Sequence, residues 1–336
     1  TGQVETLDWG DPTTIRAKRS DAVRERRLGS QGPDLSVIGF GAWEAGGGSE
    51  WGRPPPEGQV LNAIRSVFDC GIDWIDTAEV YGRGRSEELV GKAVAGRRDE
   101  VRLASKVAPV PEGSGFRAEQ VRAACEESLR RLGTQHLDLY QLHWPDGGRI
   151  PVEETWAAMA GLVDDGLVRF IGVSNFDRDL IERCQAIRHV DSLQQEFSML
   201  ELRDRDLIRW CGEQGTGVLS YSPLAFGLLT GAIGPESRFD ADDVRSGRDE
   251  GSLFAPGNRE RNHAVVEALR PFAERLDITL AQLALAWNVH QPGVTAAIAG
   301  SRNPDHVRSN AAAGDVELDD ATLSELDAIV SRAAAG

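Results

Sequence analysis

Four side chains that can hold or transfer a proton follow the ends of short apolar runs: Asp76, Tyr81, Lys106 and His143. A tyrosine phenol has an ordinary pKa of about 10, but a neighbouring ammonium lowers it. Lys106 can supply that ammonium, and Asp76 can keep it charged. Tyr81 would then be a general acid for a carbonyl oxygen that receives a hydride, and His143 would orient the same oxygen.

The elements that position these residues alternate along the chain. Short β-type runs are each followed by a segment with helical spacing, as where the run 101–106 precedes Val121, Cys125, Leu129 and Leu132. Such alternation indicates parallel strands with helical crossovers, and eight units favour a closed (β/α)8 TIM barrel over a doubly wound open sheet, the alternative. The strands are expected at Ser36–Phe40, Ile72–Ile75, Val101–Ser105, Leu137–Leu142, Val168–Val173, Ser192–Gln194, Gly217–Leu219 and Val294–Ile298.

Three segments lie outside the eight units. Residues 1–27 are interpreted as an N-terminal extension and 28–336 as a single barrel domain. The stretch from Thr230 to about Asn262 is too long for an ordinary connection. Residues 318–330 have the spacing of a C-terminal amphipathic helix.

Charge and cysteine content exclude several classes of function. The formal net charge of −16 argues against nucleic acid and anionic membranes as partners, because both require clustered Lys and Arg. The longest apolar runs are too short to span a bilayer, and the first residues lack the apolar core of a signal peptide. The four cysteines are scattered, which predicts a reducing cytoplasm. No residues have metal-ligand spacing, so a metal-free site is expected.

Several sequence segments together resemble the aldo-keto reductase family. They follow in family order from about residue 28 to 329, and the chain is most similar to bacterial members with an extended seventh-strand loop and the run Gly84-Arg-Ser-Glu-Glu-Leu89. The segments are Gly71–Gly82 with Ser86, Glu87 and Gly91; Ala104–Lys106; Leu139–His143; Gly172–Phe176; Leu219–Leu224 with Gly227–Gly231; and Gly300–Arg302 with Pro304 and Asn310.

The resemblance implies a role for each matching residue. Tyr81 is the acid, Asp76 and Lys106 tune it, and His143 positions the carbonyl. The cofactor is expected to be NADP(H), with NAD(H) as the alternative. Residues implied to bind it are Ser174, Asn175 and Gln194 at the carboxamide, Tyr221 on the nicotinamide ring, Ser222 and Leu224 along the pyrophosphate, and Ser301, Arg302, His306 and Asn310 at the adenosine end, together with Ala42, Trp43, Gly227 and Gly300. Trp43 and Trp144, with Tyr81 and His143, would line the substrate pocket.

Two departures from the family pattern concern the adenosine end. His306 stands where the family often has Arg or Gln, and Ser309 stands where it often has Glu. Both departures allow weaker binding of a 2′-phosphate, so NAD(H) remains the alternative cofactor. Gln194 and Gln195 are adjacent, and the alignment favours Gln194 as the cofactor contact.

Three functions fit these residues. The leading one is an NAD(P)H-dependent reductase of a small aldehyde, ketone or sugar. The same chemistry in reverse would make an NAD-dependent aldose or alcohol dehydrogenase. A redox-sensing regulatory subunit that binds NADP(H) is the third. The glycines of Gly39-Phe-Gly41 do not form a G-x-G-x-x-G fingerprint, so a Rossmann domain is disfavoured.

Overall fold

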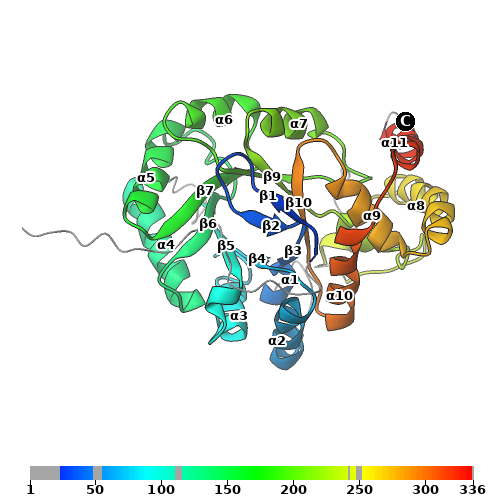
Figure 1. Ribbon diagram of the computed structural model, residues 1–336, viewed down its shortest axis with the longest axis horizontal. Helices are drawn as coiled ribbons and strands as arrows, with labels where there is room; N and C mark the ends of the chain where they lie inside the picture. Colours follow the sequence, from blue (N-terminus) through cyan, green and yellow to red (C-terminus); the bar gives the residue numbers. More distant parts are fainter. Residues whose placement is uncertain (1–22, 48–54, 110–115, 241–242, 247–251, 335–336) are drawn as a thin grey trace, which may run out of the picture.

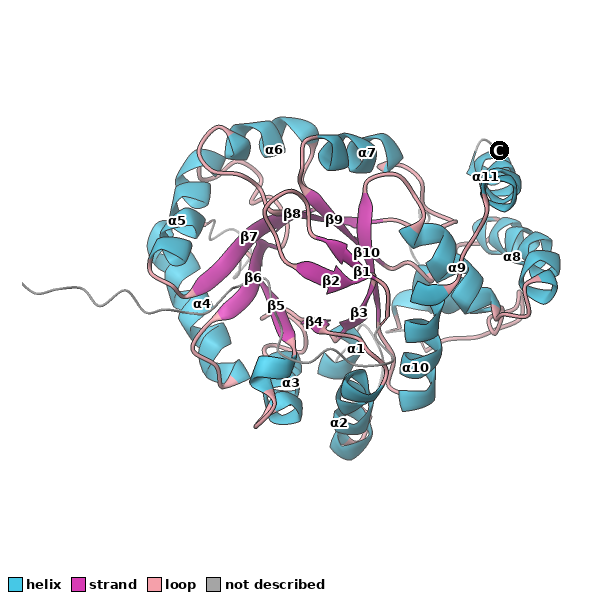
Figure 2. Cartoon of the chain, viewed as in Figure 1, coloured by secondary structure: helices cyan, strands magenta, loops and turns pink. Residues whose placement is uncertain are grey.

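In the computed structural model the described residues are 23–47, 55–109, 116–240, 243–246 and 252–334. Their strands form a closed parallel barrel in the order β10-β3-β4-β5-β6-β7-β8-β9, with helices around the outside (Figure 1; Figure 2). This confirms the predicted (β/α)8 TIM barrel and rules out the open sheet. The barrel strands are β3 (Ile38–Gly41), β4 (Trp74–Asp76), β5 (Arg102–Val107), β6 (Leu137–Leu142), β7 (Val168–Ser174), β8 (Ser192–Glu196), β9 (Gly217–Tyr221) and β10 (Val294–Ala299).

The outer helices follow the strands in the alternation that the sequence predicts. Their apolar faces cover the barrel, and the strands beneath are buried on both sides, as expected for a parallel sheet. The helices are α1 (Trp43–Gly46), α2 (Glu57–Arg65), α3 (Arg85–Val94), α4 (Ala118–Leu132), α5 (Val152–Asp164), α6 (Arg178–Gln185), α7 (Arg205–Glu213), α8 (Asn258–Arg275), α9 (Leu280–Val289), α10 (Pro304–Ala312) and α11 (Asp320–Ala334).

An antiparallel hairpin, β1 (Glu25–Arg27) and β2 (Asp34–Ser36), precedes the barrel. Its Leu28 and Leu35 pack with barrel residues of the core, and the Ser30 amide donates a hydrogen bond to the Gly215 carbonyl just before β9. The hairpin therefore covers the amino-terminal ends of the strands. Residues 25–27, assigned from the sequence to an extension, pair within this hairpin, whereas residues 1–22 of that extension lie outside the described part.

The first barrel strand was predicted at Ser36–Phe40, and its predicted first residue is wrong. Ser36 ends β2, and β3 begins only at Ile38. The backbone amide of Ser36 is turned to the Asp73 carboxylate (2.8 Å), and its hydroxyl donates to the Ile38 carbonyl (2.7 Å). These side-chain bonds break the run into two strands. A continuous apolar run cannot reveal such a break.

The long stretch after β9 folds against the barrel mouth. It begins with the short helix η3 (Ala225–Thr230), and its described parts include η4 (Val244–Ser246). The rings of Phe239 and Phe254 meet edge to face with centroids 5.7 Å apart. The C-terminal helix expected at 318–330 is present as α11, which packs against α8. Among the described residues, no helix is both long enough and apolar enough to span a bilayer.

Candidate active site

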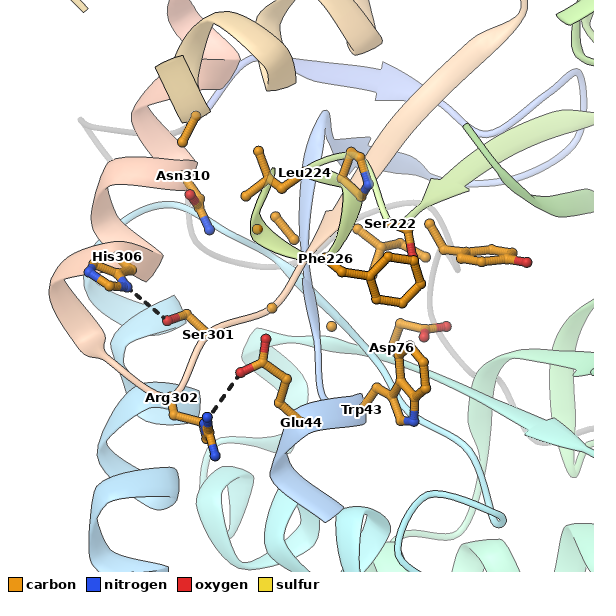
Figure 3. A pocket seen from close by; sticks show the side chains of 18 of the residues that line it. Trp43, Glu44, Asp76, Ser222, Leu224, Phe226, Ser301, Arg302, His306 and Asn310 are labelled. Atoms are coloured by element: carbon orange, nitrogen blue, oxygen red, sulfur yellow. Dashed lines mark hydrogen bonds and ion pairs between the residues drawn. The ribbon is translucent and has the colours of Figure 1, made fainter. Parts of the chain in front are cut away.

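A cavity of about 960 Å³ opens at the carboxyl-terminal ends of the barrel strands, where TIM-barrel enzymes place their active sites. This volume lies at the upper end of the range for ligand pockets. The cavity extends from Asp76 and Trp43 at one end to His306 and Asn310 at the other (Figure 3). Its elongated lining joins the predicted catalytic residues to the predicted adenosine site.

Asp76, Tyr81 and Lys106 form a hydrogen-bonded group at the base of the cavity. Lys106 is the penultimate residue of β5 and is fully buried, and its ammonium donates to Asp76 Oδ2 (2.6 Å), to the Thr77 carbonyl (3.0 Å) and to the Tyr81 hydroxyl (3.1 Å). Burial alone would lower the pKa of Lys106, but the charges of Asp76 and Tyr81 outweigh it and the pKa is raised. Lys106 therefore stays charged beside the phenol.

Asp76 also connects this group to the cofactor wall. Asp76 is the last residue of β4, and its Oδ1 accepts a hydrogen bond from the Gln194 side chain (2.9 Å), which comes from β8. Gln195 points elsewhere and donates to Asp204 (2.7 Å). Gln194 lines the cavity and Gln195 does not, in agreement with the alignment.

His143 follows β6 and faces Tyr81. The two rings meet edge to face with centroids 5.5 Å apart. Burial, and next the charge of Lys106, hold the pKa of His143 well below its usual range. Its Nδ1 is buried and has no hydrogen-bond partner among the described residues. The ring is therefore a neutral imidazole, which can donate one hydrogen bond and accept another.

The end of β7 places Ser174 and Asn175 on the cavity wall. Asn175 has a φ of +59°, a left-handed conformation that asparagine tolerates better than most residues. Its Nδ2 donates to Ser174 Oγ (3.1 Å), and its Oδ1 accepts from the Tyr221 hydroxyl (2.8 Å). Tyr221 comes from the end of β9, so these bonds fix a tyrosine ring and an amide side by side.

Aromatic rings enclose the catalytic end of the cavity. Trp43 lies 6.1 Å from Tyr81 and 6.1 Å from Phe226, measured between ring centroids. Trp144 lies 4.5 Å from His143 and is 36% exposed. The pocket beside the phenol is thus apolar and partly shielded from water. A small organic substrate suits such a lining.

The loop after β9 supplies the middle of the cavity wall. Ser222 and Phe226 have φ values of +52° and +54°, and Gly227 has +96°. These left-handed residues turn the backbone back toward the cavity, where Ser222, Leu224 and Gly227 all lie. Backbone amides and a hydroxyl in such a turn are suitable donors to a phosphate chain.

The far end of the cavity carries the polar groups expected around adenosine. Ser301 Oγ lies 3.3 Å from His306 Nδ1, and Asn310 lies on the next turn of α10. Arg302 is paired with Glu44, with 3.4 Å between Nε and Oε2 (Figure 3). Gly300 lies close to Gly41, since a Cβ on Gly300 would come within 2.5 Å of the Gly41 carbonyl oxygen. An elongated cavity whose far end carries an arginine side chain and a hydroxyl group fits a dinucleotide.

Two expected residues lie off the cavity surface. Lys106 lies beneath it and contacts the Tyr81 hydroxyl. Ala42 is fully buried, and its backbone donates to the Asp76 carbonyl (2.8 Å) and accepts from Ser86 Oγ (2.7 Å), so it supports the scaffold. All the other predicted site residues line the cavity.

Sequence reasoning missed several charged or polar lining residues, including three that lie near Arg302 or carry charge. Glu44, Gln59 and Arg245 face the cavity from α1, α2 and the segment after β9. The one available signal was the carboxylate directly after Trp43. Nothing in the spacing connects Arg245 with the cavity, because its position depends on how the long segment folds.

Comparisons with known proteins identify the family of this chain. The aldo/keto reductase family model matches residues 37–331. The aldo-keto reductase YhdN of Bacillus subtilis is 35% identical over 289 residues, covering 84% of this chain and 86% of the relative. Among solved structures, the glycerol dehydrogenase AKR11B4 from Gluconobacter oxydans has a TM-score of 0.81 and 29% identity, covering 95% of this chain and 98% of its own.

A second solved structure carries a ligand. The aldo/keto reductase from Klebsiella pneumoniae, in complex with NADP and acetate, has a TM-score of 0.70 and 33% identity, covering 92% of this chain and 96% of that one. The family match and the similarity to YhdN both extend over most of the sequence. The chain therefore belongs to the aldo/keto reductase family, a family of NAD(P)H-dependent oxidoreductases.

Proposed function

We propose that this protein reduces the carbonyl of a small aldehyde, ketone or sugar with NADP(H), and that Tyr81 is the general acid. The observation that carries the proposal is the position of the Lys106 ammonium, 3.1 Å from the Tyr81 hydroxyl and 2.6 Å from Asp76, at the base of the large cavity. This arrangement stabilises the phenolate, so the phenol gives up its proton more readily.

The cofactor assignment rests on the donor groups of the cavity. Ser174, Asn175 and Gln194 would hold the carboxamide of the nicotinamide, and Tyr221 would pack on its ring. Ser222, Leu224 and Gly227 would hold the pyrophosphate; Ser301, Arg302, His306 and Asn310 would hold the adenosine end. When bound, NADPH supplies a hydride to the carbonyl carbon.

The protein residues donate the proton and orient the carbonyl group. The carbonyl oxygen gains negative charge as the hydride arrives, and Tyr81 donates its hydroxyl proton to that oxygen. Lys106 stabilises the phenolate that remains, while neutral His143 donates a hydrogen bond to the same oxygen and orients it. Trp43 and Trp144 exclude water beside the reacting atoms. The proton is restored to Tyr81 from solvent after product leaves.

The same residues can run the reaction in the direction of oxidation. In that case phenolate Tyr81 accepts the proton of an alcohol. One structural neighbour is named a glycerol dehydrogenase, which makes a polyol the substrate class to test in this direction. Microscopic reversibility assigns Tyr81 and Lys106 the same roles in both directions.

The proposal is tested by turnover with purified protein. We expect consumption of NADPH with a panel of short-chain aldehydes, aromatic aldehydes, ketones and aldoses, followed by absorbance, with product identified by mass spectrometry. Tight NADPH binding without turnover of any carbonyl or alcohol would instead support a regulatory subunit. Binding of neither NADPH nor NADH would contradict the proposed function.

A further inference from the structure

The pairing of Glu44 with Arg302 places a carboxylate inside the end of the cavity that would receive adenosine. The two residues come from α1 and from the loop after β10, and 3.4 Å separates Arg302 Nε from Glu44 Oε2. The Glu44 side chain points into the cavity toward Arg302 in Figure 3. Gln59 donates to the Arg302 carbonyl (3.2 Å), which fixes the backbone of this loop. The guanidinium is thus held beside an anion before any ligand arrives.

A second ion pair lies close to the first. Arg245, from the segment after β9, also lines the cavity and is paired with Asp243 (2.7 Å). Arg245, Asp243 and His306 are near enough to influence the Glu44 carboxyl, whose pKa is raised by burial against the opposing charge of Arg302. The formal charges of the two arginines and the two carboxylates cancel. A phosphate of about −1.5 to −2 charge would therefore meet a site without net positive charge from these four groups.

We propose that Glu44 is a specificity-determining residue for the cofactor: its carboxylate competes with the 2′-phosphate of NADPH for Arg302 and so lowers the preference for NADPH over NADH. The proposal deepens the proposed function and depends on it, because it requires the adenosine end of the cofactor to lie beside Arg302. NADH carries a hydroxyl at that position and places no second anion next to Glu44. Only NADPH therefore has an anionic group that competes with the Glu44 carboxylate for Arg302.

The test is a set of binding titrations with NADPH and NADH, followed by tryptophan fluorescence and by calorimetry. Glu44→Gln keeps the size of the side chain and an oxygen that accepts from Arg302, but it removes the charge. We expect its Kd for NADPH to fall by on the order of tenfold, because the 2′-phosphate no longer competes with a carboxylate for the Arg302 guanidinium. The Kd for NADH should change little.

The matched control is Glu57→Gln. Glu57 is an exposed carboxylate on α2 that pairs with Lys92 (2.9 Å), so this variant removes one negative charge without touching the cavity. It should leave both dissociation constants unchanged. An equal gain in NADPH affinity in both variants would contradict the proposal, because it would show an effect of overall charge alone.

A double variant tests whether Glu44 acts through Arg302. In the Arg302→Ala background, Glu44→Gln should bring no further gain in NADPH affinity. Adenosine 2′,5′-bisphosphate and AMP, which probe the adenosine end alone, should reproduce the difference between NADPH and NADH. An unchanged NADPH-to-NADH ratio in Glu44→Gln, or weaker NADPH binding, would overturn the role of Glu44 and leave the proposed function standing. Failure of the unmodified protein to bind either dinucleotide would overturn both.

Discussion

The side-chain amide of Gln194 donates a hydrogen bond to Asp76 Oδ1 at 2.9 Å, while the other oxygen of Asp76 accepts from Lys106 at 2.6 Å. One carboxylate therefore joins the residue that would hold the nicotinamide carboxamide to the lysine that contacts the Tyr81 phenol. A shift of Gln194 on cofactor binding would act directly on the partner of Lys106. In the proposed mechanism, cofactor position and the acidity of Tyr81 would thus be coupled through Asp76.

Replacement of Tyr81 by Phe should reduce turnover by about 10²- to 10⁴-fold, the usual contribution of a general acid. The NADPH Kd should be preserved, because the hydroxyl contributes to proton transfer rather than to holding the dinucleotide. Steady-state kinetics and a binding titration measure the two quantities separately. Tyr140→Phe is the matched control, since it removes the hydroxyl of a buried tyrosine in β6 outside the cavity. Comparable losses in both variants would refute the assigned role.

Replacement of Lys106 by Met should lower the free energy of unfolding by about 3–5 kcal/mol, because it leaves the buried Asp76 charge without its cation. Urea denaturation measures this change. Lys92→Met removes an exposed lysine and should cost less than about 1 kcal/mol. Adding Asp76→Asn to Lys106→Met should recover most of the loss. A double variant as unstable as Lys106→Met would show that the uncompensated charge is not the cause.

His143 should make stability depend on pH below neutrality. Its pKa is lowered in the folded state, so the unfolded chain, with a histidine pKa of about 6.5, binds the proton first as pH falls. The free energy of unfolding therefore decreases as pH falls through that value. Between about pH 7.5 and about pH 5.5 this contribution should reach about 1 kcal/mol. Urea denaturation of the unmodified protein and His143→Asn should show a smaller pH dependence in the variant; identical slopes would contradict a neutral, buried His143.

Replacement of Arg302 by Ala should weaken NADPH binding by about 10- to 100-fold, the effect of losing a hydrogen bond between charged groups. NADH binding should fall much less, because NADH has no 2′-phosphate. Arg308→Ala serves as the control, since Arg308 is an exposed arginine on α10 that pairs with Asp305 (2.9 Å). Parallel titrations with NADPH and NADH measure the two losses of affinity. Equal losses for NADPH and NADH in Arg302→Ala would place the 2′-phosphate elsewhere.

The sequence predicted the barrel because each strand and helix has its own local signal. Lys106 and Asp76 could be placed at strand ends, and parallel strands bring their carboxyl ends to the same edge. The hairpin before the barrel was not predicted, because no glycine, proline or other turn residue separates Ser36 from Ile38 in the sequence. The turn of Ser36 toward Asp73 depends on a partner far along the chain.

The candidate site was predicted best where a motif carried it. Glu44 was missed because it lies on the short helix α1, which has no clear signal in the sequence, and Arg245 was missed because its position follows from the conformation of the segment after β9. The ion pair between Glu44 and Arg302 connects the segments that follow the first and last barrel strands, β3 and β10. Only the closed barrel brings these two residues together.

The barrel is completed by pairing β3 with β10, strands from opposite ends of the folded chain. Contacts between such distant segments slow folding, since a long loop must close before they form. The cavity straddles this junction, with Gly41 and Trp43 on one side and Gly300 and Ser301 on the other. A dinucleotide bound there would bridge the junction and favour the closed chain by mass action. In a cell, the supply of cofactor would then influence how long each molecule of this protein survives, as well as how fast it works.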